Sequence, residues 1–399
     1  VNIGDGVGTD TVRLDADNQI ADTSMVSLAS SGVFNVNGRS ETVGGLGAAA
    51  AGAQVQLGSG SLTVDAATAN AYAGGISGSG TFTKAGVGNL TLSGNSSSFS
   101  GTTNVFAGVI TLQSGNALGT SAVAVSSGAA LEVQGGISTG AGTLALSGTG
   151  VNGGGALRNI SGANTWDGAI MLNADSRINS AAGTLTLSNT ITSGSNQSLA
   201  IGGAGDISLT NFIALGGGTL TKDGAGTLTI SSNATLGNVT LNAGTLQSNG
   251  TLPSITGNLT LAGGTLLLTG GTNLSVGVLH ITGNTVIDFG SASASILNIS
   301  TLLVDSGVLV TVNNWTGLSD YFYLQNFTGA RLYTTGAAPE NQIGFSGFSN
   351  DDTAWQSYDH QIAPVPEAET YGALLLAAAI AFVGWHRSRL ALRVHGGDI

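Results

Sequence analysis

The sequence has no cysteine and few charged side chains. Only 8% of its 399 residues are charged, against a usual level of about 25%. Without cysteine the chain forms neither disulfides nor thiolate metal sites, and its composition is compatible with an oxidising or a reducing compartment. Proline contributes 4 residues and aromatic residues 5% of the chain, whereas glycine contributes 65 residues. This composition argues against ordinary globular domains, although the length alone suggests two or three.

Disorder is the first alternative for a glycine-rich chain. Disordered segments are poor in apolar residues and rich in charge. Here 41% of the residues are hydrophobic and the mean hydropathy is +0.29, so the chain has apolar surface to bury. Most of that surface comes from Ala, Val, Leu and Ile, which predicts a thin core of small aliphatic side chains.

The few charges are mostly negative. The net charge is −12, and the residues before Tyr371 hold 21 of the 22 acidic side chains but only seven of the ten basic ones. An acidic body repels phosphate backbones, so we expect no nucleic-acid partner. No signal peptide is visible after Val1. We interpret the sequence as the C-terminal part of a longer product, with a mature N-terminus after leader cleavage as the alternative.

Internal repetition dominates the sequence. One unit begins Gly-Thr-Phe-Thr-Lys-Ala-Gly at residues 80–86, and another begins Gly-Thr-Leu-Thr-Lys-Asp-Gly at 218–224. Most copies continue with apolar residues alternating with Thr or Ser, a period of two that is typical of strands. Gly, Asn and Ser separate these short segments and favour turns. The dipeptides Asn37-Gly38 and Asn249-Gly250 also allow some antiparallel hairpins.

A β-solenoid satisfies this pattern, because each coil places its strands on the next coil at about 4.8 Å. With roughly 20–25 residues per coil, residues 1–285 would form about a dozen coils. A β-sandwich or a propeller is the competing interpretation, and the lack of regular bulky core aromatics counts against it.

Four segments resemble autotransporter-associated β-strand repeats: residues 1–14, 80–113, 155–170 and 218–247. The resemblance covers about 1–285. It implies a right-handed parallel β-helix that is exported and displayed like an adhesin-type passenger. It does not extend to an autotransporter, because nothing after residue 300 has the alternation of barrel strands with aromatic girdles.

Residues 286–362 differ in composition. Two segments, 296–304 and 308–312, are still typical of strands, and aromatic residues then concentrate. We expect terminal strands and an aromatic-rich β cap that covers the open end of the solenoid. An aromatic sugar-binding platform is the functional alternative. The aromatic residues concerned are Trp315, Tyr321, Phe322, Tyr323, Phe327, Tyr333, Phe345, Phe348, Trp355 and Tyr358.

The C-terminus reads as a linker (363–370), a transmembrane helix (371–386) and an Arg-containing cytoplasmic tail (387–399). The uncharged stretch of 15 residues spans about 22 Å as a helix, short of a hydrocarbon core of about 30 Å. An amphipathic or buried terminal helix is therefore the alternative. The membrane-facing residues would be Tyr371, Leu374, Leu375, Leu376, Ile380, Phe382, Val383 and Trp385, and the basic stop would be Arg387, Arg389 and Arg393.

This order of motif, helix and Arg cluster resembles the PEP-CTERM sorting signal of exopolysaccharide-producing Gram-negative bacteria. The matching residues are Val365, Pro366 and Glu367, and Ala368 stands where the family has a second proline. The resemblance implies an exosortase-type processing enzyme as a partner. It also implies association with the inner membrane during sorting, followed by display at the cell surface or in the extracellular matrix.

Candidate chemistry is sparse. Lys84 and Lys222 occupy the same repeat position, which repeat duplication explains better than a shared site. Asp351-Asp352 and Asp359-His360 lack a basic partner and are typical of solvated loops. The segment 4–10 resembles one calcium-binding β-roll repeat, a motif that works in tandem copies. The four histidines have no ligand spacing. We therefore predict no catalytic residue, no metal site and no cofactor.

Two functions remain open. The first is a non-enzymatic structural or adhesive protein of a biofilm or polysaccharide matrix, whose Thr, Ser and Asn side chains bind glycans weakly and many times. The second is a β-helix carbohydrate-active enzyme, a polysaccharide lyase or hydrolase, which would need acidic and basic side chains clustered in a groove.

Overall fold

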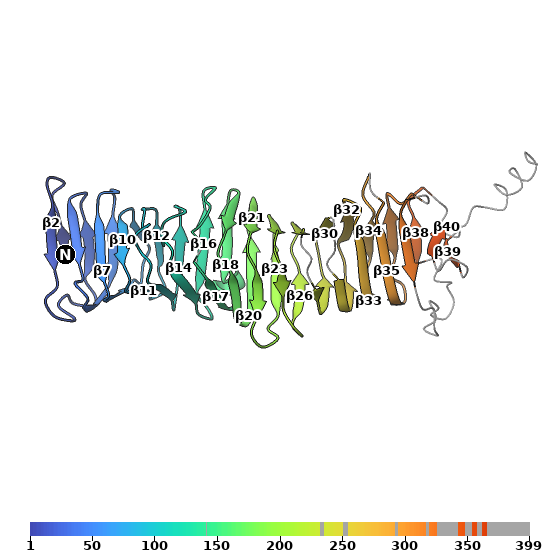
Figure 1. The fold of residues 1–399 in the computed structure, drawn as a ribbon, viewed down its shortest axis with the longest axis horizontal. Helices are drawn as coiled ribbons and strands as arrows, with labels where there is room; N and C mark the ends of the chain where they lie inside the picture. The colour runs from blue at the N-terminus through green and yellow to red at the C-terminus, as the bar shows by residue number, and fades with distance from the viewer. Residues whose placement is uncertain are drawn as a thin grey trace, which may run out of the picture.

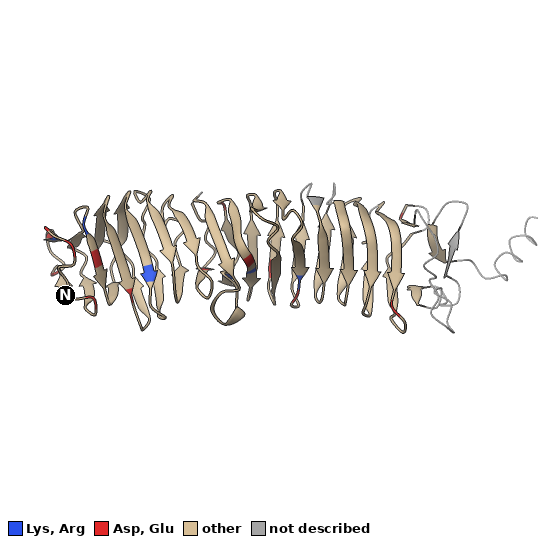
Figure 2. Cartoon of the chain, turned by 90° about the horizontal axis from the view of Figure 1, so that it is seen from below, with Lys and Arg blue, Asp and Glu red and all other residues tan. Residues whose placement is uncertain are grey.

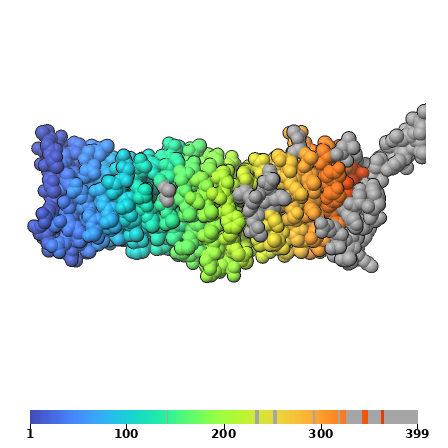
Figure 3. Space-filling model, viewed as in Figure 1, coloured from blue at the N-terminus to red at the C-terminus, as the bar shows by residue number. Residues whose placement is uncertain are grey.

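The chain coils into an elongated parallel β-solenoid of about 15 turns. Figure 1 shows the strands stacked along the long axis, with the N-terminus at one end, and Figure 3 shows the same rod in space-filling form. The computed structural model describes residues 1–140, 142–231, 235–249, 254–291, 294–316, 319–324, 342–347, 353–356 and 361–364. The all-β class and the parallel solenoid that we predicted are confirmed.

Each turn visits three faces in the same order. The first face holds β1 (Asn2–Ile3), β3 (Met25–Leu28), β6 (Gly45–Ala48), β9 (Asn70–Tyr72), β12 (Asn89–Leu92), β14 (Val109–Leu112), β16 (Ala130–Gln134), β18 (Leu157–Ser161), the second half of β20 (Ile170–Ser180), β23 (Leu199–Gly203), β26 (Thr219–Lys222), β29 (Asn238–Leu241), and the second halves of β31 (Ser254–Leu261), β33 (Asn273–Ile281) and β35 (Ile296–Val304).

The second face is built in two runs. The N-terminal run holds β2 (Asp10–Arg13), β4 (Gly32–Asn35), β7 (Gln54–Gly58) and β10 (Gly75–Gly78). The second run holds β19 (Asn164–Trp166), β21 (Thr184–Leu187), β24 (Asp206–Leu209), β27 (Thr227–Ile230), β30 (Thr245–Asn249), β32 (Thr265–Thr269), β34 (Thr285–Asp288), β36 (Val310–Asn313) and β38 (Ile343–Phe345). Between the runs lie isolated bridges and a short 3₁₀ turn, η1 (Val151–Gly153).

The third face begins with β5 (Ser40–Val43), β8 (Ser61–Asp65), β11 (Thr81–Ala85), β13 (Thr102–Val105), β15 (Ala122–Val125) and β17 (Leu144–Gly148). It continues with the first half of β20, β22 (Ile191–Ser193), β25 (Ile213–Ala214), β28 (Thr235–Leu236), the first halves of β31, β33 and β35, and β37 (Tyr321–Leu324). Two antiparallel strands, β40 (Gln361–Pro364) and β39 (Thr353–Gln356), follow β37 at the C-terminal edge.

Alternation decides which side chains enter the core. In β27 the threonines are half-exposed and Leu228 and Ile230 are buried. Residues in register on neighbouring coils repeat this choice, so Leu228 stacks between Ile207 and Leu246. The result is the core of small aliphatic side chains that the composition predicts, continuous along the rod.

The observed strand pairing can be compared with the expected end of the repeats at residue 285 and with the expected hairpin at Asn37-Gly38. The parallel pairing runs past residue 285, because β34 pairs with β36 and β36 with β38. Asn37 and Gly38 do form a turn with φ of 55° and 74°. That turn joins β4 on the second face to β5 on the third rather than closing a hairpin, and each of these strands pairs with other coils.

A column of glycines marks the corner where the chain enters the third face. A Cβ atom on Gly80 would lie 1.9 Å from the carbonyl oxygen of Gly60, and one on Gly101 would lie 1.8 Å from that of Gly80. The backbones of successive coils therefore approach too closely at this corner for any side chain. Much of the glycine content follows from such contacts rather than from loose loops.

Replacing Gly101 with alanine tests this constraint. The new methyl group collides with the backbone of the preceding coil, so Gly101→Ala should lower the free energy of unfolding by about 1–3 kcal/mol. The matched control is Gly194→Ala, since a Cβ there meets nothing within 4 Å. Urea denaturation followed by circular dichroism measures both, and equal midpoints for the two variants would contradict close coil packing at residue 101.

Candidate functional site

The predicted sorting segment lies outside the described residues. This holds for the Val365, Pro366 and Glu367 motif, for the proposed membrane helix and for the basic stop. Asp351-Asp352 and Asp359-His360 also lie outside. Within the described ranges, no helix is long and apolar enough to cross a membrane.

A groove lies on the outside of the rod where long strands bend from the third face to the first. It has a volume of about 240 Å³ and crosses β31, β33 and β35. The bend breaks the regular ladder, since the register between β31 and β33 shifts between Ile255 and Asn258. The lining residues are Ser254, Ile255, Thr256, Ser275, Val276, Gly277, Asn298 and Ser300.

The polar residues of this groove form a column along the rod. Ser254 pairs with Ser275, and Ser275 pairs with Asn298 on the next coil. The side chains of Ser254, Ser275 and Asn298 face outward. The next residues along β31 and β33, Ile255 and Val276, are buried in the core. The side-chain Oδ1 of Asn298 is shielded from solvent and accepts no hydrogen bond from the described residues. The column therefore presents hydroxyl and amide groups, one of them with unused hydrogen-bonding capacity.

A pair of tyrosines continues this surface on the next coil. Tyr321 and Tyr323 lie two residues apart on the outer side of β37, with ring centroids 5.3 Å apart and planes only 3° from parallel. Tyr323 is in register with Asn298, and Tyr321 with Ile296. Two of the aromatic residues that we considered for a sugar-binding platform thus stand beside the groove. Sequence patterning alone did not reveal the groove itself, although outward Ser and Asn at equivalent strand positions were visible.

None of the described residues that line the groove is ionisable. Figure 2 shows few charged positions, in blue and red, on a mostly tan ribbon. The nearest ionisable side chain on β33 is His280, near the far end of the strand, whose Nε2 lies 2.9 Å from the Oδ1 of Asp305. The groove is therefore suited to hydrogen bonding and apolar contact rather than to charge recognition.

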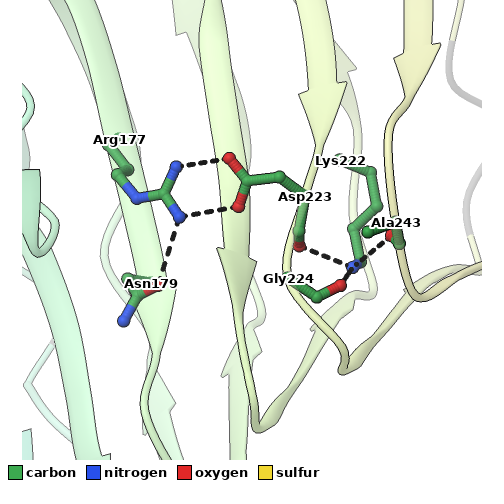
Figure 4. Close-up of polar contacts among 6 residues, drawn as sticks. All are labelled: Arg177, Asn179, Lys222, Asp223, Gly224 and Ala243. Atoms are coloured by element: carbon green, nitrogen blue, oxygen red, sulfur yellow. Dashed lines mark hydrogen bonds and ion pairs between the residues drawn. The ribbon is translucent and has the colours of Figure 1, made fainter. Parts of the chain in front are cut away.

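Lys84 and Lys222 point inward and are almost completely buried. The Nζ of Lys222 donates to the carbonyl oxygens of Asp223 at 2.7 Å, Gly224 at 2.9 Å and Ala243 at 3.1 Å, as Figure 4 shows. Lys84 makes the equivalent contacts, to Ala85, to Gly86 at 2.7 Å and to Ala107 at 3.4 Å. Each amine therefore holds its own corner and the corner of the next coil together.

The two lysine corners occupy different edges of the rod. Lys84 is the penultimate residue of β11 on the third face, whereas Lys222 ends β26 on the first face. Burial lowers the pKa of Lys84 to about 8, with the Asp65 carboxylate acting in the opposite direction. Burial also lowers the pKa of Lys222, opposed chiefly by Asp223. The shared role is structural, in agreement with repeat duplication.

Paired charges lie on the outside of the first face. Arg177 binds Asp223 through two hydrogen bonds of 2.6 Å (Figure 4), and this bonding raises the pKa of Arg177. Gly202 lies between them, and a Cβ there would stand 1.8 Å from an Asp223 oxygen. Arg158 binds Glu132 at 3.3 Å, and its Nε has no partner among the described residues. Each carboxylate is thus neutralised by its own arginine.

The segment resembling a calcium-binding repeat uses its carboxylates locally. Asp5 accepts a hydrogen bond from the backbone of Val7, and Asp10 accepts hydrogen bonds from Asp5 and Ser31. Among the described residues, no three His, Asp or Glu side chains gather as metal ligands would.

Comparison with known families gives one match. Residues 82–112 and 220–247 match the passenger-associated-transport-repeat. This confirms the repeat resemblance for those two segments, each of which contains strands that flank a buried-lysine corner. No curated protein and no solved structure matches the chain.

The buried lysines predict a pH-dependent stability. The folded pKa of Lys84, about 8, lies below its ordinary value of 10.5. Between these values the unfolded chain binds more protons, so stability should rise with pH, by at most about 1.4 kcal/mol per pH unit. We expect the urea midpoint of the wild type to increase relative to that of Lys84→Met between pH 8 and pH 10.

Measurements should stop at pH 10, because burial raises the pKa of Tyr72 and its ionisation destabilises the fold at higher pH. Lys84→Arg is the matched control, since arginine stays charged throughout this range and should behave like Lys84→Met. A constant difference between the wild type and Lys84→Met from pH 8 to pH 10 would show that Lys84 does not titrate as proposed.

Proposed function

We propose that this chain is an exported, non-enzymatic structural or adhesive protein of a Gram-negative cell surface or extracellular matrix. The observation that carries the proposal is the combination of passenger-associated transport repeats with a parallel β-solenoid of about 15 turns. Such rods project a long surface with a small, self-supporting core. The surface has few charges and many hydroxyl and amide groups, which suits weak, repeated contacts with hydrated polysaccharide.

The C-terminal segment would direct the chain to the cell surface or matrix. In this proposal the Val365, Pro366 and Glu367 motif, the apolar helix after Tyr371 and the Arg cluster serve as a PEP-CTERM-like sorting signal. An exosortase-type enzyme would process the chain at the inner membrane and release the solenoid into an exopolysaccharide-rich biofilm. The apolar helix would then be a temporary anchor.

A carbohydrate-active enzyme is the second candidate. The observation in its favour is the row of Glu132, Arg158, Arg177 and Asp223 on the outer first face, where acidic and basic side chains do gather. Glycoside hydrolysis needs one carboxyl group free to donate a proton and another free to act as base or nucleophile. Here each carboxylate is already bound to an arginine, which favours the structural role.

Retention by the producer's own exopolysaccharide tests the first function. We expect the full chain to co-sediment with the insoluble polymer at physiological ionic strength, and salt to have little effect because the surface carries few charges. The control is a charged polymer of similar size. Loss of retention at physiological salt would reject the matrix role, and release of new reducing or unsaturated ends during incubation would favour the enzyme instead.

Processing in the producing cell tests the sorting route. Pro366→Ala combined with Glu367→Ala should leave the full-length chain in the inner membrane, whereas the wild type appears shortened at the surface or in the medium. Ala368→Pro restores the family motif and should raise the processed fraction. Immunoblots of membrane and secreted fractions measure this, and identical fractionation of all three proteins would reject exosortase-type sorting.

A further inference from the structure

Resting on the proposed matrix function, we infer that the groove of β31, β33 and β35, together with Tyr321 and Tyr323, binds a neutral polysaccharide chain running along the rod. The described surface elsewhere also carries hydroxyl and amide side chains, together with the charged row of the first face. This region brings a concave surface, hydrogen-bonding groups and flat aromatic rings together.

Hydrogen-bonding chemistry favours a carbohydrate. Ser254, Ser275 and Ser300 each supply a hydroxyl group that both donates and accepts, and Asn298 adds an amide. The Oδ1 of Asn298 is shielded from solvent and accepts no bond from the described residues, so a sugar hydroxyl that enters the groove would donate to it once the Asn298 side chain rotates. Leaving such an acceptor buried and unmatched costs free energy that a ligand recovers. Asn298 is therefore a specificity-determining residue in this proposal.

The tyrosine pair supplies the apolar half of the recognition. A pyranose ring has one face of C–H groups that packs on an aromatic ring, while its hydroxyl groups point sideways. Tyr321 and Tyr323 are stacked almost parallel, so one face of each ring packs on the other, and the pyranose ring would pack on the outer face of Tyr321. Tyr323 follows Asn298 in the same column, one coil farther along. A chain that lies in the groove therefore reaches the rings without changing direction.

Charge separates neutral from acidic polysaccharides. A uronate carboxylate in the groove would lose water without gaining an arginine, a lysine or a histidine among the lining residues. Burying an unpaired charge in this way is costly. The chain's net charge of −12 adds long-range repulsion. The ligand is therefore a neutral, hydroxyl-rich chain.

Register sets the direction and length of the ligand. Ser254, Ser275, Asn298 and Tyr323 occupy one column over four successive coils. The coil spacing of about 4.8 Å is close to the length of one pyranose unit in an extended chain. Each coil then contacts one sugar unit, and a tetrasaccharide fills the column.

Titration with defined oligosaccharides tests this site. The probes are cellotetraose, laminaritetraose, maltotetraose and mannotetraose, their shorter homologues, and tetragalacturonate as the acidic counterpart. We expect the full chain to bind at least one neutral tetrasaccharide more tightly than its disaccharide, and tetragalacturonate to bind most weakly. Calorimetry measures the affinities.

Two variants and one control locate the binding. Tyr321→Ala and Asn298→Ala should each lower the affinity for the neutral tetrasaccharide about tenfold, which is the effect of losing one aromatic contact or one hydrogen bond. Phe106→Ala removes an exposed aromatic residue from a distant corner and should leave binding unchanged. Thermal unfolding checks that all three variants fold.

Each result separates this site from the general function. No binding of any neutral tetrasaccharide, tightest binding of tetragalacturonate, or equal affinities in the folded variants would overturn the groove proposal. If the variants keep the wild-type affinity for the tetrasaccharide while the producer's polymer is still retained, the matrix role stands and this site is wrong. If the oligosaccharides bind as expected but the polymer is not retained, the site stands and the matrix role falls.

Discussion

The close approach of backbones in successive coils is the constraint on which the rest of the structure depends. Parallel ladders fix the coil spacing on the faces, so the backbones of successive coils also lie close together at the corners. At Gly80 and Gly101 a carbonyl oxygen of the preceding coil occupies the space that a Cβ would need. The sequence therefore carries glycine at the corners and alternation on the faces, and both features recur with the length of a coil.

Stacking in register also limits charge. A charged side chain that recurs on each coil would face its own copy at about 4.8 Å, where like charges repel. The solenoid keeps most positions on its faces uncharged and pairs some of the charges that it has, as Arg177 does with Asp223. The buried lysines follow the same logic, because Lys84 and Lys222 each satisfy backbone carbonyls of two coils and recur once per matched repeat.

Alternation, turn residues and internal repetition were enough to predict the strands and the solenoid, since these depend on local periodicity. The composition predicted the aliphatic core, and the family resemblance implied the parallel arrangement. The assignment of strands to faces was not predictable. The unit at 80–94 turns from the third face to the first, whereas its copy at 218–231 turns from the first to the second. A repeat therefore specifies a corner, and the accumulated loop lengths decide which of the three corners it forms. Asn37-Gly38 shows the same dependence, because a turn suited to a hairpin here connects two faces.

The groove illustrates why a site on such a rod escapes sequence analysis. It arises where β31, β33 and β35 run through the corner as single bent strands instead of breaking at a glycine turn. The bend opens a concavity that no single coil contains, and its lining comes from residues about one coil length apart in sequence. Ser275 or Asn298 alone resembles any outward position of the solenoid. Only the stacking of coils places them in line with Tyr323, so binding capacity is a property of consecutive coils rather than of one repeat.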